Sequence, residues 1–161
     1  MSAVAQKTGE KQVIIFNLGN QTCGIDINNI LEIIRPEIIT AVPGSPDFVK
    51  GIIKLRGRVI PVIDLPARLG GGSSLLMETT RIIIGEAGSA TAGMIVDSVS
   101  EVFRFSTEQI KPPPDIITSK ATSCLEGIVL VDERLIILLD LNRLLHEEGK
   151  KLGDILANVE L

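Results

Sequence analysis

An internal repeat constrains the fold more than any other feature of the sequence. Residues 51–69 (GIIKLRGRVIPVIDLPARL) and residues 127–145 (GIVLVDERLIILLDLNRLL) are related by an offset of 76 positions. Seven of the nineteen positions are identical, and most of the others exchange one aliphatic residue for another. Each copy has two apolar runs around a central dipeptide, which predicts a β-hairpin with a two-residue turn. An aspartate, Asp64 or Asp140, then stands where it can cap a short helix.

The two copies differ at the turn of this hairpin. The first copy has Arg56-Gly57 there, and the second has Asp132-Glu133. Features that both copies share are explained by the fold, so a difference between them is a candidate for function. Arg56 is either a solvated turn residue or an exposed guanidinium on a rigid turn that contacts a partner.

A second pair of hairpins repeats at an offset of 69. Strands are expected over residues 12–18 and 22–27, and again over 80–85 and 90–96, with Gly19 matching Gly88, Gly24 matching Gly93 and Glu32 matching Glu101. Behind the first pair, Asp26 and the apolar residues of 28–34 predict a short capped helix. Behind the second pair, residues 98–105 predict a strand. A further short strand is expected over 38–41.

The repeated plan predicts a mainly β protein built from two small five-stranded barrels side by side. The glycine-rich break at 70–74 sets the boundary, with a first barrel over about 11–70 and a second over about 75–147. The seam leaves room for strand exchange. Residues 1–10 are expected to be a flexible tail, and residues 148–161 are compatible with a C-terminal helix.

Composition excludes several classes of function. The net charge is −4 and aromatic residues make up only 2% of the chain, whereas nucleic-acid binding needs a basic surface and stacking platforms. No apolar run approaches the roughly 20 residues that span a bilayer, and the first ten residues lack the apolar stretch of a secretory signal. Cys23 and Cys124 are expected to be unpaired thiols. We therefore expect a cytoplasmic protein that binds no nucleic acid and does not insert in a membrane.

Enzymatic chemistry has little support. His146 is the only histidine, so a metal cluster or a nucleophile–histidine pair would have to use this one residue. No serine lies in a GxSxG motif, and the glycine-rich run at 70–74 lacks the lysine of a phosphate-binding loop. Asp64 and Asp140 are better explained as caps than as a carboxylate pair. No metal site and no cofactor are expected.

Several short motifs follow one another in a specific order. They are CGIDI at 23–27 with ILEI at 30–33, VP at 42–43, FVKG at 48–51, LRG at 55–57 leading to IPVIDL at 60–65, GMIVD at 93–97, and EQI at 108–110 before PPP at 112–114. On these motifs, residues 11–147 resemble the CheW family, the adaptor proteins of bacterial chemotaxis. The sequence departs from the family at Lys54, where asparagine is common.

The resemblance implies two SH3-like barrels and no enzymatic activity. It implies two partners: the cytoplasmic tips of methyl-accepting chemoreceptors, and the regulatory domain of the histidine kinase CheA, bound through the barrel ends. The receptor-binding residues that it implies, in a groove between the barrels, are Ile30, Glu32, Ile33, Arg56 and Gly57, with Val96 and Val99 as neighbours. From the residues alone, Ile30 and Ile33 could either pack in the core or line an apolar groove for a partner helix.

The length of the chain favours a free-standing adaptor recruited to membrane receptor arrays, because it leaves room for neither a kinase nor a receiver domain. The alternative is a standalone domain of the same family that competes with or modulates the coupling of CheA to receptors.

Overall fold

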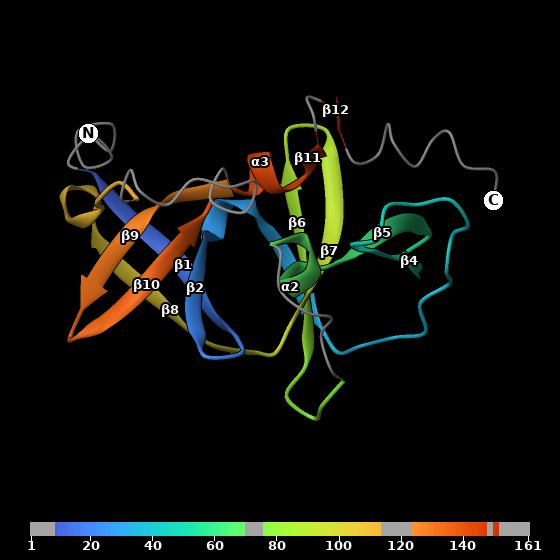
Figure 1. Cartoon of the computed structure of the whole chain (residues 1–161), viewed down its shortest axis with the longest axis horizontal. Coiled ribbons are helices and arrows are strands. Elements are labelled where there is room, and N and C mark those ends of the chain that lie inside the picture. The colour runs from blue at the N-terminus through green and yellow to red at the C-terminus, as the bar shows by residue number, and fades with distance from the viewer. Residues whose placement is uncertain (1–8, 70–75, 114–123, 148–149, 152–161) are drawn as a thin grey trace.

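The computed structural model describes residues 9–69, 76–113, 124–147 and 150–151. Two five-stranded sheets lie side by side in this part of the chain, with short helices between them (Figure 1). The strands of the first half are β1 (Glu10–Leu18), β2 (Gln21–Asp26), β3 (Ile30–Ile34), β4 (Val49–Leu55) and β5 (Arg58–Asp64). Those of the second half are β6 (Arg81–Ala87), β7 (Ala90–Val96), β8 (Ser98–Ser106), β9 (Leu125–Val131) and β10 (Arg134–Leu139).

Each sheet takes strands from both halves of the chain. Sheet A has the order β8-β1-β2-β10-β9, and sheet B has the order β3-β6-β7-β5-β4. The sheets therefore do not coincide with the contiguous ranges 11–70 and 75–147. The β1–β2 hairpin lies with three strands of the second half, and the β6–β7 hairpin lies with three strands of the first half. The duplicated plan and the mainly β class are confirmed, but the strand exchange is much larger than a local one at the seam.

Both sheets are curled. An isolated bridge joins Lys111, beyond the end of β8, to Ile128 on β9, and a similar bridge joins Thr40 to Ile52 on β4. In the described residues, however, the two edge strands of a sheet do not pair with each other, so neither barrel is closed by strand pairing. The second bridge is all that forms where a strand was expected over 38–41.

Three apolar clusters make up the core of the described residues. One fills the concave side of sheet A around Val13, Ile15 and Val129, and another fills that of sheet B around Ile60, Val62 and Ile82. The largest lies between the sheets and takes side chains from both, including Phe16 from β1 and Met94 from β7. Apolar burial thus holds the two sheets together as one unit.

The expected hairpins and caps are confirmed. Arg56 and Gly57 form the β4–β5 turn with φ values of 52° and 80°, as a turn with two left-handed residues requires. Asp64 then caps α2 (Leu65–Arg68), where its carboxylate accepts a hydrogen bond from the Ala67 backbone N–H. Asp140 caps α3 (Leu141–Leu144) in the same way.

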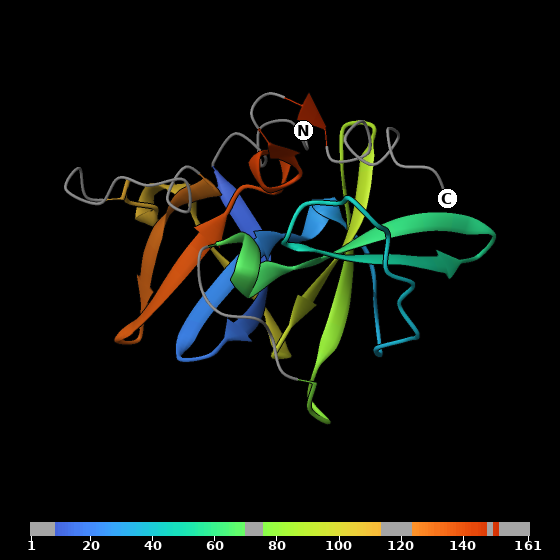
Figure 2. The ribbon, with the colours of Figure 1, turned by 45° about the vertical axis from the view of Figure 1, so that its right-hand side comes forward.

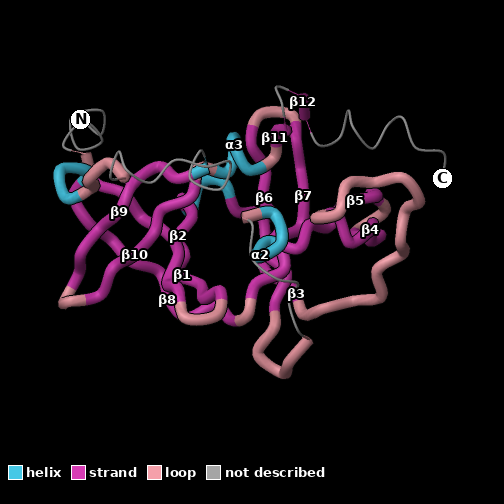
Figure 3. The backbone as a smooth tube through the Cα atoms, in the orientation of Figure 1, coloured by secondary structure: helices cyan, strands magenta, loops and turns pink. Residues whose placement is uncertain are grey.

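The helix expected over 28–34 is wrong. Asp26 does cap a helical turn, and its carboxylate accepts a 2.8 Å hydrogen bond from the Asn28 backbone N–H, but this turn is the 3-10 helix η1 (Ile27–Asn29). The chain then extends into β3, where the β-branched isoleucines pair with β6. Figure 3 draws the segment labelled β3 as a strand.

The remaining described elements lie at the ends of β8 and of the chain. The 3-10 helix η2 (Thr107–Gln109) follows β8, and β11 (His146–Glu147) pairs with β12 (Lys150–Lys151). The expected C-terminal helix does not include Lys150 and Lys151, and its other residues lie outside the described part of the chain, as do residues 1–8 of the expected tail. No helix in the described ranges is long and apolar enough to cross a membrane.

Candidate interaction site

The edge strand β3 carries three of the residues singled out in the sequence. A β-bulge in this strand determines which face of the sheet each side chain occupies. Ile30 pairs with Gly85 and Glu32 with Ile84, so Leu31 is an extra residue between them. Ile30 therefore faces the core between the sheets, and Glu32 faces the concave side of sheet B. Because Ile33 pairs with Ile83, it returns to the face of Ile30, where it remains 38% exposed.

Glu32 and Arg56 form a bidentate ion pair. The Nε and Nη2 atoms of Arg56 donate hydrogen bonds of 2.9 Å to the two carboxylate oxygens of Glu32. The pair joins the edge strand β3 to the turn beyond the opposite edge strand β4, so it lies across the mouth of the curled sheet. The hydrogen bonds from Arg56 hold the pKa of Glu32 below its ordinary value, and those bonds also raise the pKa of Arg56. The pair is ionised at neutral pH while 74% of the arginine side chain stays exposed.

The other expected site residues have different roles. Gly57 completes the turn, and a Cβ at this position would meet nothing within 4 Å, so its left-handed φ explains the glycine. Val96 is fully buried in the core between the sheets and offers no contact surface. Val99, near the start of β8, is partly buried against the same core. The structure thus groups Ile30, Ile33 and Val99 around the core between the sheets and sets Glu32 with Arg56 at the rim of sheet B.

Sequence reasoning missed several exposed apolar residues. Leu31, at the bulge, is 50% exposed beside Ile33. Leu130 and Leu135 face each other across the β9–β10 hairpin, and each is 61% exposed. The turn position alone fixes the register of a two-residue hairpin, so counting back from Asp132-Glu133 would have shown that these two leucines pair.

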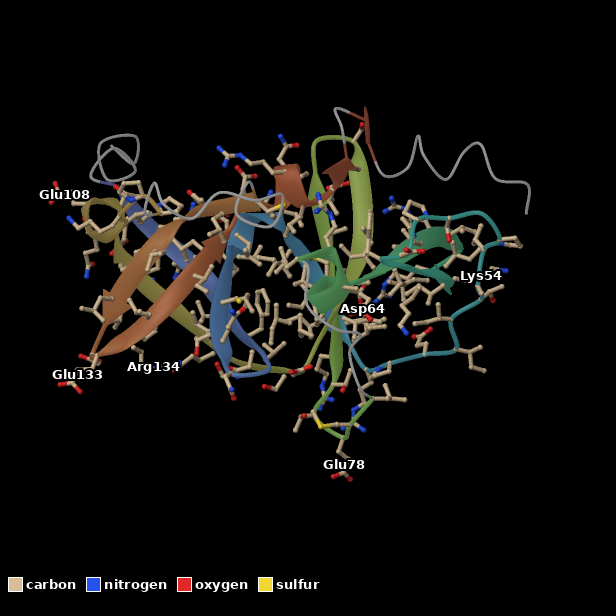
Figure 4. All side chains as sticks on the ribbon, viewed as in Figure 1. Lys54, Asp64, Glu78, Glu108, Glu133 and Arg134 are labelled. Carbon is tan, nitrogen blue, oxygen red and sulfur yellow. The ribbon has the colours of Figure 1, made fainter. Side chains whose placement is uncertain are left out.

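The equivalent outer face of the β4–β5 hairpin carries Lys54 and Val59 instead. Beside this pair lies an open pocket of about 440 Å³, lined further by Glu37, Ile38, Thr40, Ile52 and Ile53. The two hairpins lie at opposite ends of the molecule (Figure 2), with Lys54 near one end and Glu133 and Arg134 at the other (Figure 4).

The described residues hold no group of three or more histidine, cysteine or acidic side chains that could bind a metal ion. Burial raises the pKa of the Cys23 thiol to about 12, so this thiol stays protonated and unreactive at neutral pH. Fold and surface together define a protein–protein interaction module: two sheets around one core, with exposed apolar edges and fixed charges.

Comparisons with known proteins identify the family of this module. Residues 12–149 match the CheW-like domain. The chain is 36% identical over 157 residues to the chemotaxis protein CheW of Klebsiella aerogenes, which covers 98% of this chain and 95% of that protein. It is 34% identical over 153 residues to CheW of Thermotoga maritima, covering 95% and 99%. The crystal structure of the scaffolding protein TtCheW from Thermoanaerobacter tengcongensis superposes with a TM-score of 0.81 at 39% identity, covering 89% of this chain and 92% of that one.

The chain belongs to the CheW-like family of chemotaxis scaffold proteins, which are not enzymes. The expected family is thereby confirmed, as is the mainly β fold with its two five-stranded sheets.

Proposed function

We propose that this chain couples methyl-accepting chemoreceptors to the histidine kinase CheA, as a cytoplasmic adaptor recruited to membrane receptor arrays. In this proposal, the receptor tip binds in the groove between the sheets, along β3 and up to Arg56 in the β4–β5 turn. The regulatory domain of CheA binds the barrel ends, on the outer faces of the hairpins. Family membership supports the two partners. The observation that carries the receptor site is the bidentate Glu32–Arg56 pair next to the exposed apolar residues of β3.

The chemistry of the β3 edge suits a helical partner. A receptor tip is a helical hairpin, and an amphipathic helix binds by laying its apolar face against apolar side chains. Leu31 and Ile33 supply such a surface, and Ile30 and Val99 are partly buried against the core between the sheets. The ion pair holds Arg56 in one conformation, so the guanidinium loses little side-chain entropy when a partner binds.

The hairpin ends suit the second partner. Leu130 and Leu135 form an exposed apolar pair on sheet A, and Val59 lies beside the open pocket on sheet B. Apolar side chains on both outer faces would give a neighbouring β-domain two alternative places to dock, each on a single sheet.

The test is to measure the two binding events separately. Co-sedimentation with receptor tips, and with the isolated regulatory domain of CheA, should each show saturable binding. Receptor, CheA and this protein should then be combined and kinase activity measured with and without receptor ligand. A gain in receptor-controlled kinase activity supports coupling. Binding without any gain, or a loss of a pre-existing signal on titration, contradicts it and favours the competing domain.

A further inference from the structure

Two equivalent one-turn helices lie at the junction of the sheets. α2 follows β5 of sheet B, and α3 follows β10 of sheet A at the repeat offset of 76 (Figure 1). Leu65 of α2 and Leu141 and Leu144 of α3 are buried in the core between the sheets. Each helix is therefore fixed to its own sheet at one end and packs in the shared core.

A direct polar contact connects the two helices. Nε of Arg68, the last residue of α2, donates a 3.3 Å hydrogen bond to the carbonyl oxygen of Leu144, and its Nη2 donates a longer 3.5 Å bond to that of Arg143. The guanidinium also lies 5.2 Å above the ring of Phe48. Carbonyls at the end of a helix lack helical donors and carry partial negative charge, so they suit a cation.

This contact has no mirror image across the repeat. The residue that corresponds to Arg68 at the offset of 76 is Leu144, the residue whose carbonyl accepts the bond. The asymmetry means that the repeated fold does not explain the arginine, because α3 caps and packs equally well with a leucine at the same position.

The contact adds directional bonds beside a core that is apolar. Apolar burial is non-directional, so the core between the sheets resists separation more than it resists small rotations of one sheet on the other. Hydrogen bonds with fixed geometry, together with a stacked ring, set an angle. Ile33 belongs to sheet B and Val99 to sheet A, so the angle between the sheets determines the spacing of these two residues.

We infer that Arg68 is a positioning residue that fixes sheet A relative to sheet B, so that a rigid helical partner can contact both sheets at once. The inference rests on the proposed function for its consequence in binding, but not for its structural content. A partner that binds one hairpin face alone depends on a single sheet and is insensitive to the angle.

The experiment compares Arg68→Ala with Arg81→Ala as a matched control. The Nη1 atom of Arg81 also donates to backbone carbonyls, those of Glu78 and Thr80, but both residues lie just before β6, so neither bond connects the two sheets. Spin labels are placed at Val59→Cys on β5 and Val102→Cys on β8, both exposed and on different sheets. The two native cysteines are buried and should not be labelled.

Double electron–electron resonance should show one narrow distance for the parent and for Arg81→Ala, and a broadened or shifted distance for Arg68→Ala. Urea unfolding verifies that each variant is folded. Receptor-tip affinity should fall about fivefold in Arg68→Ala while affinity for the CheA regulatory domain stays within about twofold. An unchanged distance distribution in Arg68→Ala overturns the inference. If the parent binds no receptor tip at all, the proposed function fails while the distance measurement still decides the role of Arg68.

Discussion

The β4–β5 and β9–β10 hairpins share a backbone but differ in surface chemistry. Both turns place two consecutive residues at positive φ, Arg56-Gly57 in one and Asp132-Glu133 in the other. In both, a glycine at the start of the hairpin lets another segment pass closely, and an aspartate at its end caps a helix. What differs is the charge at the turn, cationic on sheet B and anionic on sheet A. Comparison of the two copies therefore separates the residues that the fold requires, the glycine and the capping aspartate, from the turn residues whose charge the fold does not determine.

The ion pairs of the two sheets show the same division. Glu32 and Glu101 correspond in the repeat, and each pairs with an arginine of the hairpin in its own sheet. On sheet A the partner is Arg134, the first residue of β10, through one contact of 3.4 Å. On sheet B the residue equivalent to Arg134 is Arg58, which instead donates to the hydroxyl of Thr91. The bidentate pair on sheet B uses Arg56, a residue with no equivalent arginine, so selection for a contact explains it better than the fold does.

The largest effect on stability is expected at the glycine that both hairpins share. At Gly51, where φ is 150°, a Cβ would overlap the backbone carbonyl oxygen of Thr40. Gly51→Ala should therefore lower the free energy of unfolding by about 3 kcal/mol, because backbone rather than a side chain must move. Urea denaturation measures this.

In the equivalent change Gly127→Ala, the new Cβ would first contact a methyl group of Ile110, which can rotate away. It would then lie 2.9 Å from the carbonyl oxygen of Lys111. It should cost less than Gly51→Ala. Equal costs would contradict the view that the close backbone approach is tighter on sheet B.

The next effect concerns the charges on which the hairpins differ. Arg56→Glu places two carboxylates together at the rim of sheet B, so receptor-tip affinity should fall about tenfold or more while the protein remains folded. Co-sedimentation gives the affinity, and circular dichroism checks the fold.

Arg134→Glu is the matched control, because it breaks the corresponding pair on sheet A. It should leave receptor-tip affinity within about twofold. Equal losses from the two variants would show that the two ion pairs contribute alike, and the assignment of the charged part of the receptor site to the Glu32–Arg56 pair would fail.

A smaller effect is expected at the second residue of each turn. Glu133 has a φ of 67°, which disfavours a side chain with a Cβ, whereas Gly57 has a φ of 80° without strain. Glu133→Gly should stabilise the protein by about 1 kcal/mol, and Gly57→Ala should destabilise it by a similar amount. Thermal unfolding of both variants measures the pair, and changes of the same sign would contradict the explanation by turn geometry.

The sequence predicted the parts of the fold that depend on local patterns. Alternating apolar runs, two-residue turns and capping aspartates located the hairpins and the short helices α2 and α3. The exchange of hairpins between the two halves could not be predicted from the sequence. Strands of both halves present similar aliphatic faces, so no local pattern shows which strand each one pairs with. The strand at 30–34 was missed because ILEII fits a buried helical turn as well as a strand. The orientation of Glu32 depends on the bulge at Leu31, which pairing with β6 creates and no local pattern reports.

The smallest expected effect is the pH dependence of the Glu32–Arg56 pair. Arg56 lowers the pKa of Glu32 in the folded protein, so the pair contributes fully above the ordinary glutamate pKa and loses its contribution as pH falls through the lowered value. Receptor-tip binding should therefore persist through the range in which ordinary glutamates titrate, and then weaken. A carbon-13 NMR titration of the Glu32 carboxyl should give a pKa below that of the same residue in Arg56→Ala. Glu32→Gln removes the titrating group, so an unchanged acid limb of binding in that variant would assign the pH dependence to a different residue.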